Sequence, residues 1–188
     1  MSQGRKANRE GEDFVLTLSA ILTEVGKFRE QPVPVKRDGV KEYLRGFISS
    51  PLFAYSGLFA HGVHMGKTIY GRTYRVSLVW RRDWPSPLAL IPSTQSTKGS
   101  ADHKLPYLFE NALRCLPVDI LLVLGGSELI GDHRKMAYVE EKVAESRQAK
   151  RQDQGKPAVA RLFRGTDDFR CWVSDGMAIG SQPQLAFA

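Results

Sequence analysis

The chain has 188 residues, of which 42% are hydrophobic and 25% are charged, a size and composition that suit one folded domain with a buried core. It contains no window of about 18 apolar residues, which excludes a membrane-spanning helix, and its two cysteines are too few for a disulfide framework. The formal net charge of +7 favours a polyanionic partner, namely DNA, RNA or an anionic membrane surface.

The distribution of this charge narrows the choice of partner. Lysines and arginines cluster beside expected strands, and no basic amphipathic helix is evident; the clusters fall in residues 67–82, 98–104, 134–135 and 147–151. This placement favours nucleic acid over a membrane. Because the polar N-terminus lacks the apolar segment of a secretory signal, we expect a cytoplasmic protein.

In the N-terminal half, we expect a flexible arm over residues 1–10 and a helix from near Glu12 to Gly26, where apolar residues recur with the helical period. Residues 31–35 are expected to be extended, and residues 40–47 to form a short helix. Three strands are then predicted over residues 58–63, 74–80 and 88–91, the first two joined by a hairpin turn at Tyr70-Gly71-Arg72.

The C-terminal half has the alternation of an α/β protein. An amphipathic helix is predicted over residues 105–116, with Pro106 in its first turn, followed by a strand over residues 119–124 that is covered on both faces. A surface helix over 136–150, a strand over 158–163 and a short helix capped by Thr166 complete a single domain of residues 11–173. A tail of residues 174–188 follows it.

One run of residues resembles a known family. Gln95, Gly99 and Ser100 are followed by Asp102, Lys104, Leu105, Pro106 and Tyr107, and then by the apolar strand. This order resembles the PD-(D/E)XK nuclease superfamily, in particular stand-alone proteins of bacteria and their mobile elements. The resemblance implies a restriction-endonuclease-like core, in which helices flank a central mixed β-sheet.

The catalytic positions depart from the pattern of that family. Counting back from Gly99 and Ser100, the glutamate of the family falls on Ile91 and its lysine on Ser93, and the aspartate of the preceding hairpin falls on Ser77. Mg²⁺ prefers carboxylate ligands, and the lysine of the family supports hydrolysis, so the sequence predicts a catalytically degenerate nuclease that uses no metal cofactor.

The same three substitutions favour binding to DNA. Two carboxylates repel a phosphate unless a metal neutralises them, whereas Ser77, Ile91 and Ser93 are uncharged. We therefore expect double-stranded DNA as a partner, together with a second protein or a second copy of the chain. The residues expected to contact DNA are Arg72, Arg75, Gln95, Lys98, Ser100 and Lys104.

Other interpretations remain open at this stage. An active endonuclease could use Mg²⁺ with relocated residues, and its candidates are Glu12, Asp102 and Lys104; the protein could also be an interaction scaffold that binds no nucleic acid. His61 and His64 have no cysteine or acid at metal-ligand spacing, which favours imidazoles near a DNA groove over a zinc site.

Overall fold

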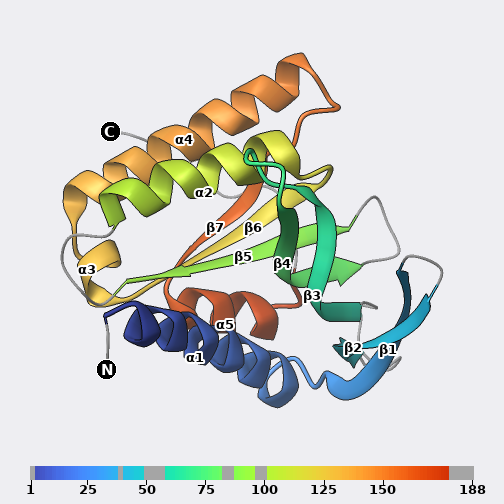
Figure 1. Ribbon diagram of the computed structural model, residues 1–188. Helices are drawn as coiled ribbons and strands as arrows, with labels where there is room; N and C mark the ends of the chain where they lie inside the picture. Colours follow the sequence, from blue (N-terminus) through green and yellow to red (C-terminus); the bar gives the residue numbers. More distant parts are fainter. Residues whose placement is uncertain (1–2, 38–39, 49–57, 82–86, 96–100, 178–188) are drawn as a thin grey trace.

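The computed structural model describes residues 3–37, 40–48, 58–81, 87–95 and 101–177. Its strands form one seven-stranded sheet in sequence order, β1-β2-β3-β4-β5-β6-β7 (Figure 1). The strands are β1 (Arg29–Arg37), β2 (Val40–Ile48), β3 (Leu58–Lys67), β4 (Thr73–Arg81), β5 (Leu88–Thr94), β6 (Asp119–Gly125) and β7 (Val159–Arg164). β1 to β5 form an antiparallel meander, and β5, β6 and β7 run parallel.

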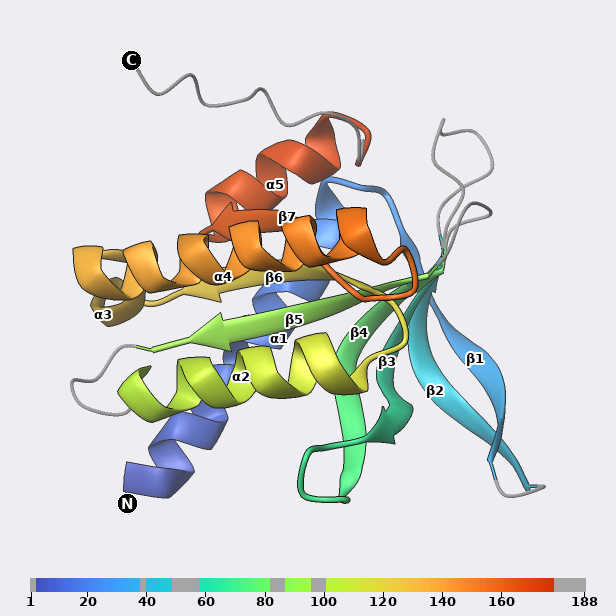
Figure 2. The ribbon, with the colours of Figure 1, turned by 90° about the horizontal axis from the view of Figure 1, so that it is seen from above.

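Helices cover both faces of this sheet, as Figures 1 and 2 show. One face carries α1 (Gln3–Glu24) and α5 (Thr166–Ser174), which pack against each other. The other face carries α2 (Ala101–Cys115) and α4 (His133–Gln152), and the short α3 (Ser127–Ile130) precedes α4. The predicted restriction-endonuclease-like α/β architecture, a central mixed sheet flanked by helices, is confirmed.

The alternation of side chains along β6 explains its continuous apolar sequence. Leu121 and Val123 pack into the core beneath α1 and α5, while Ile120, Leu122 and Leu124 pack into the core beneath α2 and α4. A strand with a helical layer on each face has no solvent-exposed side, so every position favours an apolar residue.

Most of the predicted elements are confirmed, and one is wrong. The hairpin, the strands around residues 88–91, 119–124 and 158–163, and the helices α2, α4 and α5 are all present. Residues 40–47, however, form strand β2 and not a helix. β2 pairs with β1 along its whole length, from Arg29 opposite Ile48 to Arg37 opposite Val40, so tertiary pairing overrides the local apolar spacing.

Several boundaries also differ from the prediction. α1 begins at Gln3, so residues 3–10 continue the helix and do not form a separate arm. Pro106 lies inside α2, beyond its first turn, and the residue that caps α5 is Gly165, not Thr166. Of the expected tail, Ser174 ends α5 and Met177 is buried, while residues 178–188 lie outside the described part. Among the described residues, no helix combines the length and apolar character that spanning a bilayer requires.

A close approach fixes α1 over the sheet. A Cβ atom added to Gly125, the last residue of β6, would lie 2.6 Å from ring atoms of Phe14. Only glycine leaves room for this ring. The contact holds the first half of α1 above the carboxyl ends of the parallel strands, where α1 also contacts β5.

Candidate functional site

β4 and β5 separate at one point of the sheet, and a pocket opens there. Their pairing ends at Leu78 opposite Leu90, whereas β5 continues to pair with β6 as far as Thr94. The backbone N–H of Gln95 donates to Gly125 of β6, at 3.1 Å. Because successive backbone nitrogens point to opposite sides of a strand, the nitrogen of Pro92 faces the gap left by β4. A central strand tolerates proline here because no ladder bond is lost.

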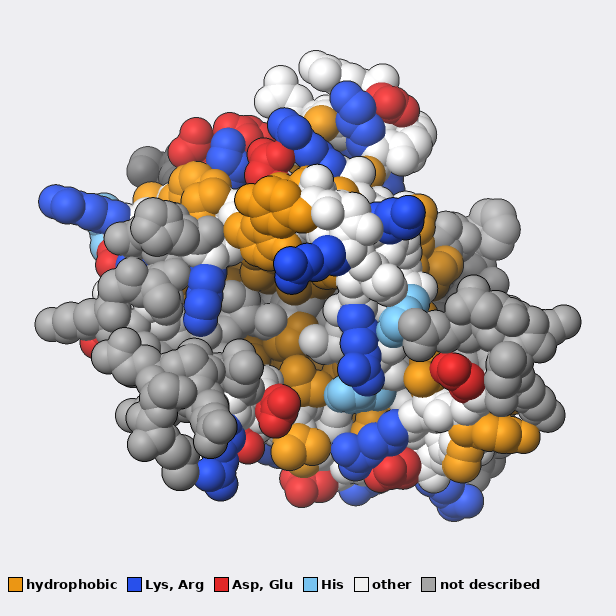
Figure 3. All heavy atoms as spheres, viewed as in Figure 1, with side chains coloured by type: hydrophobic (Ala, Val, Ile, Leu, Met, Phe, Trp, Pro, Cys, Tyr) orange, Lys and Arg blue, Asp and Glu red, His pale blue; other side chains and the backbone are white. Residues whose placement is uncertain are grey.

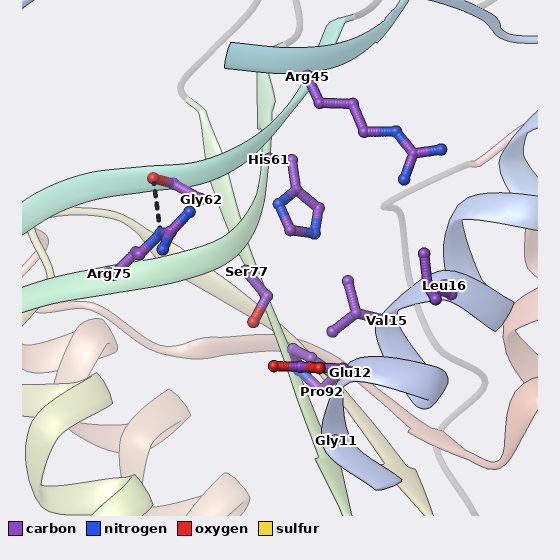
Figure 4. Close-up of a pocket in the computed structure, with 10 residues that line it drawn as sticks. All are labelled: Gly11, Glu12, Val15, Leu16, Arg45, His61, Gly62, Arg75, Ser77 and Pro92. Atoms are coloured by element: carbon purple, nitrogen blue, oxygen red, sulfur yellow. Dashed lines mark hydrogen bonds between the residues drawn. The ribbon is translucent and has the colours of Figure 1, made fainter. Parts of the chain in front are cut away.

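The pocket beside this gap has a volume of about 660 Å³ and lies between α1 and the strands. Figure 4 shows Glu12, Val15 and Leu16 of α1 on one side of it and the side chains of the strands on the other. Its described lining comprises Gly11, Glu12, Val15, Leu16, Arg45, His61, Gly62, Arg75, Ser77 and Pro92. In the space-filling view, His, Lys and Arg side chains follow one another along the middle of this face (Figure 3).

Arg75 is positioned by a glycine on the neighbouring strand. Its Nε donates to the carbonyl oxygen of Gly62 at 3.4 Å (Figure 4). Gly62 has φ +68°, and a Cβ added there would lie 2.6 Å from a terminal nitrogen of the Arg75 guanidinium. Glycine is therefore required at this position for two reasons: the backbone conformation, and the space that the Arg75 guanidinium occupies.

Arg45 brings a second guanidinium to the pocket from β2. It binds Glu30 of β1 in bidentate fashion, with its Nε 2.7 Å and its terminal nitrogen 3.0 Å from the two carboxylate oxygens. Hydrogen bonds from Arg45 lower the pKa of Glu30. The guanidinium also lies 5.2 Å from the ring centroid of Phe47. These contacts fix the orientation of Arg45 but leave it partly exposed.

His61 lies on β3, and its imidazole points into the pocket that Arg45 and Arg75 also line (Figure 4). Burial lowers the pKa of His61, and the positive charges of Arg45 and Arg75 lower it further. The free pocket therefore favours the neutral imidazole at neutral pH. A bound anion would counter both arginines and favour the imidazolium form.

The donor set of this pocket does not fit a magnesium ion. Among the described lining residues, Glu12 is the one carboxylate, and it faces two guanidinium groups that repel a cation. Mg²⁺ sites in nucleases use several oxygen ligands with negative charge. Within the described part of the chain, no three His, Cys, Asp or Glu side chains come together as a ligand set.

The structure separates the three positions at which the family pattern places catalytic residues. Ser77 lines the pocket. Ile91 faces the opposite layer, where it is buried among the residues beneath α2, and Ser93 shares the face of Ile91 because side chains alternate along a strand. Pro92, between them, is the residue of β5 that lines the pocket. The three positions therefore do not meet.

The residues expected to contact DNA are also divided. Arg75 lines the pocket, while Arg72 and Lys104 are exposed outside it. Gln95 is buried, with 4% of its surface exposed, and the groove contact by this side chain stays a prediction. Lys98 and Ser100 lie outside the described residues. Of the three relocated catalytic candidates, Glu12 lines the pocket, Lys104 does not, and the side chain of Asp102 is not described.

Sequence reasoning missed Arg45. The error follows from the expected helix over residues 40–47, which gave no reason to place this residue beside the hairpin of β3 and β4. The Arg45–Glu30 pair lies across β1 and β2, but the apolar residues of 40–48 recur with the helical spacing, so the local pattern carried no signal for this strand. His61 was expected near a DNA groove, and the structure places it between two arginines of the pocket.

Comparison with known proteins agrees with this fold. The family model of the PD-(D/E)XK nuclease superfamily domain matches residues 34–172, from within β1 into α5. No curated protein and no solved structure matches the chain. Glu12 precedes the matched residues, whereas Arg45, His61, Arg75 and Ser77 lie within them.

Proposed function

Because the chain belongs to the PD-(D/E)XK nuclease superfamily, we propose that it is a catalytically degenerate member that binds double-stranded DNA without cutting it. Its pocket between α1 and the sheet holds a phosphate of the DNA backbone in place of a metal ion. The protein then serves as the DNA-binding or assembly subunit of a larger DNA-processing complex, together with a second protein or a second copy of itself.

The observation that supports this proposal is the charge of the pocket. Arg75 carries a positive charge into a space of about 660 Å³, and guanidinium groups bind phosphate oxygens in bidentate fashion. Arg45 adds a second guanidinium, of which two nitrogens already bind Glu30. Glu12 contributes one negative charge, and Ser77 adds a hydroxyl that can donate a hydrogen bond. The Arg75 guanidinium can therefore attract a phosphate without help from a cation.

The strands that face the pocket support the absence of catalysis. The strands β3, β4 and β5 contain no Asp or Glu, and none of the residues of β5 is charged. The conclusion therefore does not depend on whether Ile91 or Pro92 occupies the position of the catalytic glutamate. Without strand carboxylates, neither the Lewis acid nor the activated water of a metal-dependent nuclease has a site.

Salt-dependent binding to a fluorescent 20-base-pair duplex tests the proposal. Neutralising about six phosphates predicts a log–log slope of roughly −5. Arg75→Gln and Arg45→Gln should each weaken binding and make the slope shallower by about one. Lys156→Gln is the matched control, because it removes the same charge from an exposed loop residue outside the pocket, and it should change the slope less.

Two results would overturn the proposal. Cleavage of plasmid DNA in Mg²⁺ or Mn²⁺ that is lost in Glu12→Ala, Asp102→Ala or Lys104→Ala would establish the relocated nuclease, for which the position of Glu12 in the pocket is the one favourable observation. A duplex affinity that does not respond to salt, with equal effects of Arg75→Gln and Lys156→Gln, would instead favour a protein scaffold.

A further inference from the structure

The tip of the β3–β4 hairpin is a rigid structure outside the pocket. The backbone N–H of Thr68 donates to Arg72 at 2.7 Å, and that of Gly71 donates to Thr68 at 2.8 Å. The backbone N–H of Arg72 also donates to the Thr68 hydroxyl, at 3.2 Å. These bonds close the turn, and Gly71, with φ +74°, supplies the left-handed residue that it needs.

A buried asparagine attaches this tip to α2. Asn111 is 2% exposed; its Oδ1 accepts from the backbone N–H of Ile69 at 3.0 Å, and its Nδ2 donates to the carbonyl oxygen of Tyr107 at 2.8 Å. The amide thus joins the hairpin directly to the helix turn that carries Tyr107. The two elements hold a fixed relative position, since losing either bond would leave a buried polar group unpaired.

This attachment presents a pair of stacked tyrosines to solvent. The rings of Tyr70 and Tyr107 have centroids 5.7 Å apart and an interplanar angle of 17°. Tyr70 is 72% exposed, and Tyr107 is 43% exposed. Tyr107 therefore supports the ring of Tyr70 from behind, and the outer face of Tyr70 has no stacking partner among the described rings. Ile69 beside it is also exposed.

Positive residues flank both tyrosines along the chain. Lys67 and Arg72 are exposed on either side of the turn, and Lys104 is exposed one helical turn before Tyr107. Glu110, one turn after Tyr107, is paired with Arg114 at 2.8 Å. Figure 3 shows hydrophobic side chains beside lysines and arginines on the face that carries α2 and the hairpin. Lysines at an aromatic patch favour a phosphate backbone over a protein interface, whose core is depleted in lysine.

We propose that the Tyr70–Tyr107 pair, here termed the tyrosine platform, stacks on an unpaired base of DNA while Lys67, Arg72 and Lys104 bind the adjacent phosphates. Bases inside a duplex are covered on both faces by their neighbours, so only an unpaired or extruded base offers a ring to Tyr70. The platform rests on the proposed DNA-binding function and adds to it a preference for DNA that contains single-stranded or distorted segments.

The test uses a 20-base-pair duplex with one unpaired 2-aminopurine as a central bulge, whose fluorescence falls when it stacks, and the same duplex with an abasic site in the bulge. The full chain should quench the 2-aminopurine and bind the abasic duplex at least about fivefold more weakly. Tyr70→Ala should lose the quenching and bind both duplexes equally. Tyr70→Phe should retain both effects, because it keeps the ring.

Tyr43→Ala is the matched control, since Tyr43 is a similarly exposed tyrosine on β2, at 62%, and its removal should leave the quenching unchanged. Asn111→Ala should weaken the quenching without removing an aromatic ring, because it releases the hairpin from α2.

The results separate this proposal from the pocket proposal. If duplex binding still depends on salt and on Arg75, but the duplex with the abasic bulge binds as well as the one with the 2-aminopurine bulge, the platform is wrong and the pocket stands. If Tyr70→Ala changes the sedimentation of the protein and leaves DNA binding intact, the platform is an interface between protein molecules, which also overturns the proposal. If no DNA binds at all, the pocket proposal fails, and the platform proposal, which rests on it, fails with it.

Discussion

Two neighbouring residues of β5 lie in opposite environments, one in the buried core and one in the open pocket. Ile91 points into a dry core beneath α2, among residues such as Leu105 and Phe109. Pro92 points into the open pocket, where it faces Glu12 and two arginines. The first position tolerates only an apolar side chain of similar volume, whereas the second borders space that water and ions can enter.

This difference separates two kinds of position on one strand of a nuclease-like fold. The side chains on the core face of β5 hold this strand in place between β4 and β6. Packing therefore restricts which residues can occupy that face. The pocket face contributes little to packing, so its side chains can change in charge at small cost. Substitutions at Ile91 and Pro92 can therefore separate the two roles.

The largest expected effect follows from placing a charge on each face in turn. Ile91→Glu would bury an unpaired carboxylate and should lower the free energy of unfolding by about 3–5 kcal/mol. Pro92→Glu should change it by less than about 1 kcal/mol, because its side chain reaches the pocket. Urea denaturation followed by circular dichroism measures both. Equal destabilisation by the two variants would contradict the assignment of faces.

A second pair of variants introduces carboxylates that could bind a metal ion in the pocket. Ser77→Asp combined with Pro92→Glu places two carboxylates beside Glu12, and this variant should bind Mn²⁺ with a dissociation constant of about 1 mM or below. Isothermal titration calorimetry and electron paramagnetic resonance of Mn²⁺ measure the gain. The matched variant, Ser77→Asp with Ile91→Glu, should not bind Mn²⁺, since its glutamate lies on the core face. The reverse outcome would restore the register that the sequence motif predicts.

The third expected effect is the displacement of Arg75 without loss of its charge. Gly62→Ala should cost about 1–2 kcal/mol of stability through backbone strain. Its Cβ would also push the Arg75 guanidinium away, so the salt dependence of duplex binding should become shallower by up to about one. Gly66→Ala is the control, because Gly66 has φ +94° but its added Cβ would meet its nearest atom, a backbone oxygen, at 3.4 Å. Identical DNA binding by the two variants would remove Arg75 from the phosphate site.

Sequence patterns predicted the C-terminal half of the fold well because local and tertiary preferences agree there. The apolar run of β6 and the periodic helix α2 each have one stable place in an α/β layer. β2 was mistaken for a helix because its partner, β1, carries Pro32 and Pro34 and gives a weak strand signal. β1 tolerates these prolines because it pairs with β2 alone among the described strands.

The site was predicted only in part. Two residues that the sequence singled out, Arg75 and Ser77, line the pocket; the hairpin of β3 and β4 that carries them was recognised from the sequence. On β5, the sequence pattern indicated Ile91, whereas the residue that lines the pocket is Pro92, and a shift of one residue moves a side chain to the other face of a sheet. Arg45 comes from the strand that was mistaken for a helix, so its distance from Arg75 depends on a pairing that residue spacing does not encode.

The smallest expected effect concerns His61, whose pKa is lowered by burial and by Arg45 and Arg75. Glu12 of α1 is the described acid of the same pocket. In the free protein the folded pKa lies below the unfolded value near 6.5. The unfolded chain therefore binds more protons between these two values, so stability rises with pH through this window and is lost as the pH falls through it. His61→Gln should lose less stability than the natural chain between pH 7.5 and pH 5.5.

DNA binding should show the opposite dependence on pH. A phosphate in the pocket would offset the charges of Arg45 and Arg75 and raise the pKa of His61 in the complex, so binding takes up protons. Duplex affinity should then increase as the pH falls from 8 to 6, by less than about tenfold per pH unit for one proton. His61→Gln should give a flatter profile. If duplex affinity depends on pH equally in the natural chain and in His61→Gln, the bound phosphate lies away from His61. It would then also lie away from the pocket face of β5.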